Sequence, residues 1–98
     1  MTFEVKKNEK EIVIEVTGRL DTVTAPSLDS FIKEEVRYYD NLILDLKNLE
    51  YISSAGLRVL LSAQKKLQND GSMKVINVCE EVMEVFEITG FTDILVIE

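Results

Sequence analysis

The sequence contains no histidine, one cysteine and one proline among its 98 residues. Without histidine the chain lacks the usual general base at neutral pH, the Ser/His/Asp and Cys/His catalytic groups, and the common zinc ligand sets. Cys79 has no second cysteine with which to form a disulfide, which fits a reducing, cytoplasmic setting. These absences exclude most familiar hydrolase chemistry, and we expect no metal and no cofactor.

Basic residues are few relative to acidic ones. The chain has 11 Lys and Arg against 18 Asp and Glu, which gives a formal net charge of −7. Because the phosphates of nucleic acids repel such a surface, we expect no direct nucleic-acid binding. The charged segment at residues 1–10 does not resemble a signal peptide, and the longest apolar run, at residues 94–97, is too short to span a membrane. We therefore expect one cytoplasmic domain over residues 1–98.

Apolar residues recur with periods that predict secondary structure. Strict alternation predicts a β-hairpin from strands that include residues 3–5 and 12–16, with Gly18 at the exit of the second strand. Helical spacing predicts an amphipathic helix over residues 25–36, with Thr24 as its N-cap. The apolar run at residues 42–46 predicts a central parallel strand that is covered on both faces.

The second half of the chain continues the alternation of strand and helix. A helix is predicted to start at the segment Ser53-Ser54-Ala55-Gly56 and to end before Gly71, and a strand follows over residues 73–78. A third helix starts at Glu80, and residues 94–97 form a last strand or a packed tail. This order predicts an α/β fold, in which a mixed β-sheet of about four to five strands packs against three or more helices.

The start of the second predicted helix is the strongest candidate site. Free backbone N–H groups and the positive end of the helix dipole meet there, so a phosphate on a serine would be favoured, with Arg58 close by. Gly56 is costly within a helix, which indicates that a partner approaches closely at this position. A role as N-cap alone would also explain either Ser53 or Ser54.

Two carboxylates raise the alternative of acid/base or metal chemistry. These are Asp21, after the second predicted strand, and Asp45, within the third. The sequence shows neither a pocket nor a substrate group for such a reaction. We interpret Asp45 as a carboxylate that fastens a loop through backbone N–H groups at a strand end. Cys79, at the end of an apolar strand, is interpreted as a small buried hydrophobe.

Residues 42–61 contain Leu-Ile-Leu-Asp-Leu and then Tyr-Ile-Ser-Ser-Ala-Gly-Leu-Arg-Val-Leu-Leu, which resembles the signature of STAS domains, specifically the bacterial anti-sigma factor antagonists. The resemblance extends to residues 18–21 and 88–91 and so covers essentially the whole chain. In that family the helix usually opens with Asp-Ser-[Ser/Thr/Ala]-Gly, and a serine kinase that is also the anti-sigma factor phosphorylates the serine. The resemblance implies phosphorylation at Ser54, with Ser53, which stands where the family more often has aspartate, as the fallback.

The resemblance implies a protein-interaction switch that is not an enzyme. The unphosphorylated form would bind the anti-sigma factor and free the sigma factor, phosphorylation would prevent binding, and a serine phosphatase would reset the switch. The expected partner-binding residues lie around the second helix start and the loop after the second strand: Asp21, Thr22, Ser53, Ala55, Gly56, Leu57 and Arg58. A sensor that holds a small ligand or nucleotide at the second helix start is the alternative.

Overall fold

The computed structural model describes residues 1–68 and 71–98. Its strands and helices follow the predicted order: β1 (Thr2–Lys7), β2 (Glu11–Leu20), α1 (Ala25–Glu35), β3 (Asn41–Ile52), α2 (Ser54–Leu67), β4 (Ser72–Ile76) and α3 (Glu80–Thr89). Short 3-10 turns follow α1 and α3, at Val36–Tyr38 and Phe91–Asp93. The predicted α/β class, with a mixed sheet and three helices, is confirmed.

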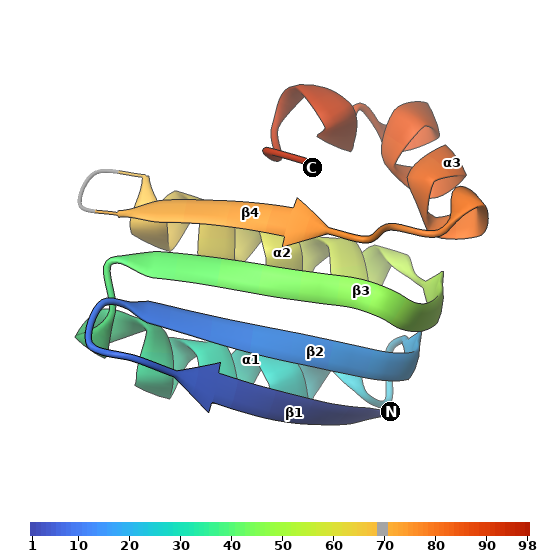
Figure 1. Ribbon diagram of the computed structural model, residues 1–98. Coiled ribbons are helices and arrows are strands. Elements are labelled where there is room, and N and C mark those ends of the chain that lie inside the picture. The colour runs from blue at the N-terminus through green and yellow to red at the C-terminus, as the bar shows by residue number, and fades with distance from the viewer. Residues whose placement is uncertain (69–70) are drawn as a thin grey trace.

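The strands form one sheet in the order β1-β2-β3-β4. β1 is antiparallel to β2, whereas β2, β3 and β4 run parallel to one another. Helices α1 and α2 each connect one parallel strand to the next, so both begin at the same edge of the sheet, on the right in Figure 1. The loops that precede these two helices therefore lie close together.

Helices α1 and α2 cover one face of the sheet, behind it in Figure 1. Beneath them Ile14, Leu44 and Val75, from the three parallel strands, are at most 1% exposed. In the part of the chain that the structure describes, no helix covers the opposite face, where Val13 and Ile43 are only half-buried. The prediction that residues 42–46 are covered on both faces is therefore wrong, because both helical connections pass the same side of the sheet.

Two residues inside strands have local explanations. Gly18 lies within β2 with a φ of 96°, where the pairing of β2 with β3 shifts register between Gly18 and Arg19. It marks a bulge and not the end of the strand, which corrects the prediction. The Oδ1 atom of Asp45 accepts hydrogen bonds from the backbone N–H of Lys47 and from Nδ2 of Asn77, each at 3.1 Å. Asp45 thus fastens the segment after β4, as predicted, but it does so through the side chain of Asn77 and from within β3, not through several backbone N–H groups at a strand end.

The C-terminal residues pack against β4. Leu95 is buried, and an isolated parallel bridge joins Val75 to Ile97. Its hydrogen bonds run from the N–H of Val75 to the carbonyl of Val96 and from the N–H of Glu98 to the carbonyl of Val75, each at 2.9 Å. The tail therefore shields part of the outer edge of β4. Among the described residues no helix is both long and apolar enough to cross a bilayer.

Candidate functional site

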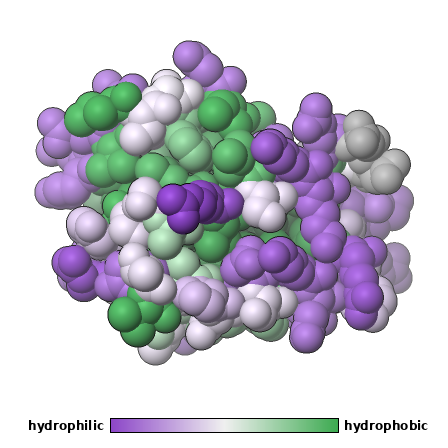
Figure 2. Space-filling model, turned by 180° about the vertical axis from the view of Figure 1, so that it is seen from behind, coloured by the Kyte–Doolittle hydropathy of each residue, from purple (hydrophilic) through white to green (hydrophobic). Residues whose placement is uncertain are grey.

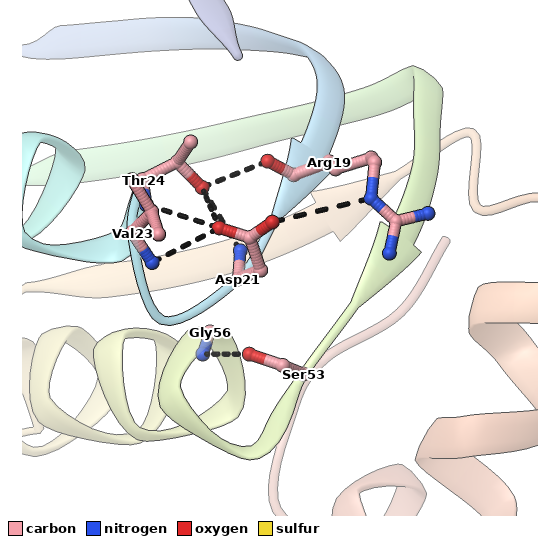
Figure 3. Close-up of polar contacts among 6 residues, drawn as sticks. All are labelled: Arg19, Asp21, Val23, Thr24, Ser53 and Gly56. Carbon is pink, nitrogen blue, oxygen red and sulfur yellow. Dashed lines mark hydrogen bonds and ion pairs between the residues drawn. The ribbon is translucent and has the colours of Figure 1, made fainter.

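The start of α2 gives its two adjacent serines different environments. Ser53 is the N-cap, and its Oγ atom accepts a hydrogen bond from the N–H of Gly56 at 3.4 Å (Figure 3). Ser54 is the first helical residue, its side chain is exposed, and its hydroxyl has no hydrogen-bond partner within residues 1–68 and 71–98. The N–H groups of Ser54 and Ala55 lie in the first turn, where the helix supplies no carbonyl partner. Ser54 is therefore an accessible hydroxyl at a helix end that favours anions.

Gly56 and Leu57 are buried beneath the exposed start of α2. Gly56 is buried, and a Cβ atom there would stand 2.7 Å from Cγ1 of Ile52 and 2.9 Å from the carbonyl oxygen of Leu20. The same carbonyl accepts a hydrogen bond from the N–H of Ser53 at 2.9 Å, and Leu57 is 7% exposed. The structure thus accounts for Gly56 by a close approach of α2 to the end of β2, inside the domain, whereas the approach of a partner at this position stays a prediction.

Residues 21–24, here named the Asp21 turn, connect β2 to α1 beside the start of α2 (Figure 3). The Oδ1 atom of Asp21 accepts hydrogen bonds from the backbone N–H groups of Val23 and Thr24, each at 3.1 Å. Thr24 occupies the N-cap position of α1 as predicted, but its hydroxyl does not cap the helix. Instead its Oγ1 atom accepts from the N–H of Asp21 at 2.9 Å and donates to the carbonyl of Arg19 at 2.8 Å.

These bonds set the electrostatics of the turn. The backbone N–H of Thr24 is the main group that lowers the pKa of Asp21 below its ordinary value. The Thr24 hydroxyl, the N–H of Val23 and the charge of Arg19 lower the pKa in the same direction, against an opposing effect of desolvation. The Nε atom of Arg19 is 3.9 Å from Oδ2 of Asp21. Asp21 therefore shapes the turn as a charged carboxylate.

Three exposed residues of this region were missed by the sequence reasoning. Val23 is 85% exposed on the Asp21 turn. The guanidinium of Arg19 lies 4.1 Å from the ring centroid of Tyr51, which is 40% exposed. The sequence signals for these residues are weak: Val23 is an apolar residue between two threonines, and Tyr51 is an aromatic residue two positions before the helix cap. Arg19 and Tyr51 lie side by side because they pair across β2 and β3.

The remaining predicted residues also lie at this end of the domain. Thr22 and Arg58 are exposed, and Ala55 is half-buried. Arg58 lies one helical turn after Ser54, on the same stripe of α2, and forms no ion pair within the described part of the chain. Seen from the helical side, apolar surface gathers toward the end where α2 begins, whereas the other end is more polar (Figure 2).

The two carboxylates of the alternative chemistry do not come together. Asp45 is in register with Glu15 of β2, whereas Asp21 comes six residues after Glu15, roughly 20 Å further along at about 3.3 Å per residue. Within residues 1–68 and 71–98, no three His, Cys, Asp or Glu side chains are grouped so as to hold a metal ion. Cys79 is half-buried, with Sγ 3.4 Å from the carbonyl of Leu49, so it is less buried than predicted.

The sequence model of the STAS domain family matches residues 2–98. The chain therefore belongs to the STAS domain family. This match confirms the family that the motifs around Asp21 and Ser54 resemble, and it spans every strand and helix described above.

Within this family, the chain is similar to anti-sigma factor antagonists, both among curated proteins and among solved structures. The chain is 33% identical over 96 residues to the anti-sigma-B factor antagonist of Bacillus subtilis (strain 168), a match that covers 97% of this chain and 88% of that protein. The anti-sigma factor antagonist SpoIIAA in its unphosphorylated form matches with a TM-score of 0.86 and 19% identity, over 99% of this chain and 88% of the other. The Bacillus cell fate determinant SpoIIAA in the phosphorylated form matches with a TM-score of 0.78 and 18% identity, over 99% of this chain and 91% of the other. At these identities the two SpoIIAA structures show the fold alone, whereas the curated relative confirms the resemblance to the anti-sigma factor antagonists.

Proposed function

We propose that the unphosphorylated chain binds an anti-sigma factor that is also a serine kinase, and that phosphorylation of Ser54 by this kinase ends the binding. The observation that carries the proposal is the difference between the two serines at the start of α2. Ser53 Oγ is used as the cap, whereas the Ser54 hydroxyl is exposed and has no partner in the described residues. The similarity to an anti-sigma-B factor antagonist supports the class of partner.

Phosphorylation acts on the surface of the domain and leaves its core intact. A phosphate adds a charge of about −1.5 to −2 at neutral pH, next to the open N–H groups of the first turn and one turn before Arg58. These groups stabilise the phosphate, so α2 stays folded. A partner with acidic groups at this surface is then repelled, and its docking must also desolvate the phosphate. A change of about 3 kcal/mol lowers affinity by about two orders of magnitude.

Ser53 is the less suitable acceptor because its oxygen already bonds the N–H of Gly56. A phosphate on Ser53 would replace this cap, whose loss costs about 1 kcal/mol in comparable helices. Its side chain is also half-buried, whereas that of Ser54 is exposed. We keep Ser53 as the fallback, and we assign Ser54 as the acceptor.

The partner-binding surface consists of the Asp21 turn, including the exposed Thr22, together with the exposed Arg58 and the half-buried Ala55. Hydrogen bonds within the turn hold its backbone before a partner arrives, which reduces the entropy lost on binding. Gly56 and Leu57 contribute from beneath, by holding α2 against β2. The chain is then a substrate of the kinase with no catalytic role of its own, and a serine phosphatase restores the binding form.

The test is a capture experiment from native lysate with three baits: wild type, Ser54→Asp and Ser53→Asp. We expect wild type and Ser53→Asp to capture an ATP-binding anti-sigma kinase, identified by mass spectrometry, and Ser54→Asp to lose it. With the purified kinase and ATP, Ser54→Ala should take up no phosphate, while Ser53→Ala should still be phosphorylated at Ser54 despite a lower stability from its lost cap.

Other outcomes would contradict the proposal in distinct ways. Loss of the kinase only with Ser53→Asp would move the phosphorylation site by one residue. Equal capture by all three baits, or no kinase with wild type, would refute the switch. The small-ligand sensor would then be the hypothesis to test, by measuring binding of nucleotides to the unmodified domain.

A further inference from the structure

A groove of about 340 Å³ runs between α1 and α2 on the helical face. Small side chains line it where the helices begin, with Ala25 on α1 and Ala55 on α2, and Val59 continues this apolar lining one turn later. Charged and polar side chains flank it further along, including Lys33 of α1 and Ser62 of α2. Ala25 and Val59 are buried, whereas Lys33 and Ser62 are exposed, so the groove is apolar at its base and polar at its rim, as binding grooves commonly are.

The groove is continuous with the surface formed by the Asp21 turn and the start of α2 at Ser54. Thr22 of the Asp21 turn and Ala55, the residue after Ser54, both line it. The two helices start at the same edge of the sheet, because β2 and β3 are parallel, so their positive N-terminal ends lie at the same end of the groove. A partner that contacts Ser54 therefore reaches the groove without crossing any other surface.

The charge of the groove is opposite to that of the whole chain. Lys33 and Arg58 both line it, and Asp29 is the acidic side chain there. Asp29 is paired with Lys33 at 2.9 Å, while Arg58 forms no ion pair within the described residues. The chain as a whole carries −7. The groove thus presents a local excess of positive charge, which attracts an acidic ligand.

We propose that this groove binds an acidic segment of the anti-sigma factor kinase, with apolar side chains that pack against Ala25, Ala55 and Val59. The proposal rests on the proposed function and adds the chemistry of the partner. An acidic segment in this position is attracted to Arg58 and Lys33 before phosphorylation. A phosphate on Ser54, one turn before Arg58, repels the same segment and competes for the same guanidinium. The groove therefore explains why added negative charge at Ser54 ends the binding.

The test measures the affinity of the purified kinase for the full chain by calorimetry, with two groove variants and a matched control for each. Lys33→Glu reverses a charge at the groove, and Lys65→Glu makes the same change on the exposed far end of α2. Ser62→Tyr fills the groove, and Ser30→Tyr adds the same ring to the exposed side of α1. Thermal unfolding followed by circular dichroism checks that each variant is folded, and Ser62→Tyr serves as the test if Lys33→Glu is not.

We expect the groove variants to weaken binding by about tenfold or more and the controls to change it by less than about twofold. Groove variants that bind like wild type, while Ser54→Asp loses the kinase, would overturn the groove and leave the switch standing. A loss with Lys65→Glu as large as with Lys33→Glu, together with normal binding by Ser62→Tyr, would attribute the effect to overall charge and overturn the groove. A wild type that binds no such kinase would overturn both proposals.

Discussion

Replacement of Gly56 by alanine tests how the start of α2, with Ser53 and Ser54, is supported. In an unstrained helix this change stabilises by about 1 kcal/mol through helix propensity. Here the new methyl group would lie 2.7 Å from a carbon of Ile52 and 2.9 Å from both Cγ and the carbonyl oxygen of Leu20. That oxygen cannot move away freely, because it accepts the hydrogen bond from the N–H of Ser53. Overpacking of this kind costs about 1–3 kcal/mol and at times more, so we expect the clash to outweigh the propensity gain.

Because three atoms, one of them a backbone oxygen, lie under 3.0 Å, we place the clash in the upper part of this range, at about 2–3 kcal/mol. Less the gain of about 1 kcal/mol, the expected net loss for Gly56→Ala is about 1–2 kcal/mol, which lowers the melting temperature of a domain of this size by roughly 5–10 °C. Urea unfolding followed by circular dichroism measures the free energy directly. Ser62→Ala is the matched control on the same helix, because Ser62 is exposed and alanine there gains propensity without a clash. If Gly56→Ala proves as stable as wild type, Gly56 is not needed for packing against β2, and the reasoning is refuted.

Two further predictions concern the Asp21 turn. Val23→Asp should weaken kinase binding by about tenfold. The control is Ile88→Asp on α3, which should have no effect, because Ile88 is also a branched apolar residue and is 83% exposed against 85% for Val23. Equal losses of affinity in the two variants would contradict the placement of the partner-binding surface at the Asp21 turn. The lowered pKa of Asp21 contributes stability that is complete above its unfolded value of about 3.9 and is lost as pH falls through the folded value. Asp21→Asn keeps an acceptor oxygen for the turn but has no carboxylate to protonate, so between about pH 5 and pH 3 it should lose less stability than wild type in urea unfolding. Identical pH dependences of the two proteins would count against a stabilising role of the charged Asp21.

The order of strands and helices was predictable because local patterns carry it. Alternating residues around Ile14 and the helical spacing after Pro26 each reflect burial of one face. The pair Ser53 and Gly71 correctly bracketed the second helix, which ends at Leu67. The fastening role of Asp45 was also predictable, since a buried carboxylate in an apolar strand needs hydrogen-bond donors.

Two expectations were wrong and a third left out contacts inside the chain, because each depends on how separate segments pack together. Gly18 was read as a strand end, but its bulge is defined by pairing with β3. Coverage of residues 42–46 on both faces failed because α1 and α2 lie on the same side of the sheet. The sequence offers a partner as the reason for glycine at position 56, while the structure places Leu20 and Ile52 against it. Ile52 is only four residues away, but Leu20 and the paired strands lie far outside a local sequence window.

The sequence by itself determined the α/β class, the family and a helix start that favours an anion next to two serines, since periodicity, capping residues and motifs are local properties. Only the tertiary structure decided which serine is open, because the Ser53 oxygen is directed to the N–H of Gly56 when α2 packs against Leu20. It also decided that Val23 is exposed beside this helix start and that α1 and α2 enclose a groove there. Parallel pairing of β2 with β3 brings these parts to one edge of the sheet, and that pairing joins segments that are far apart in the chain.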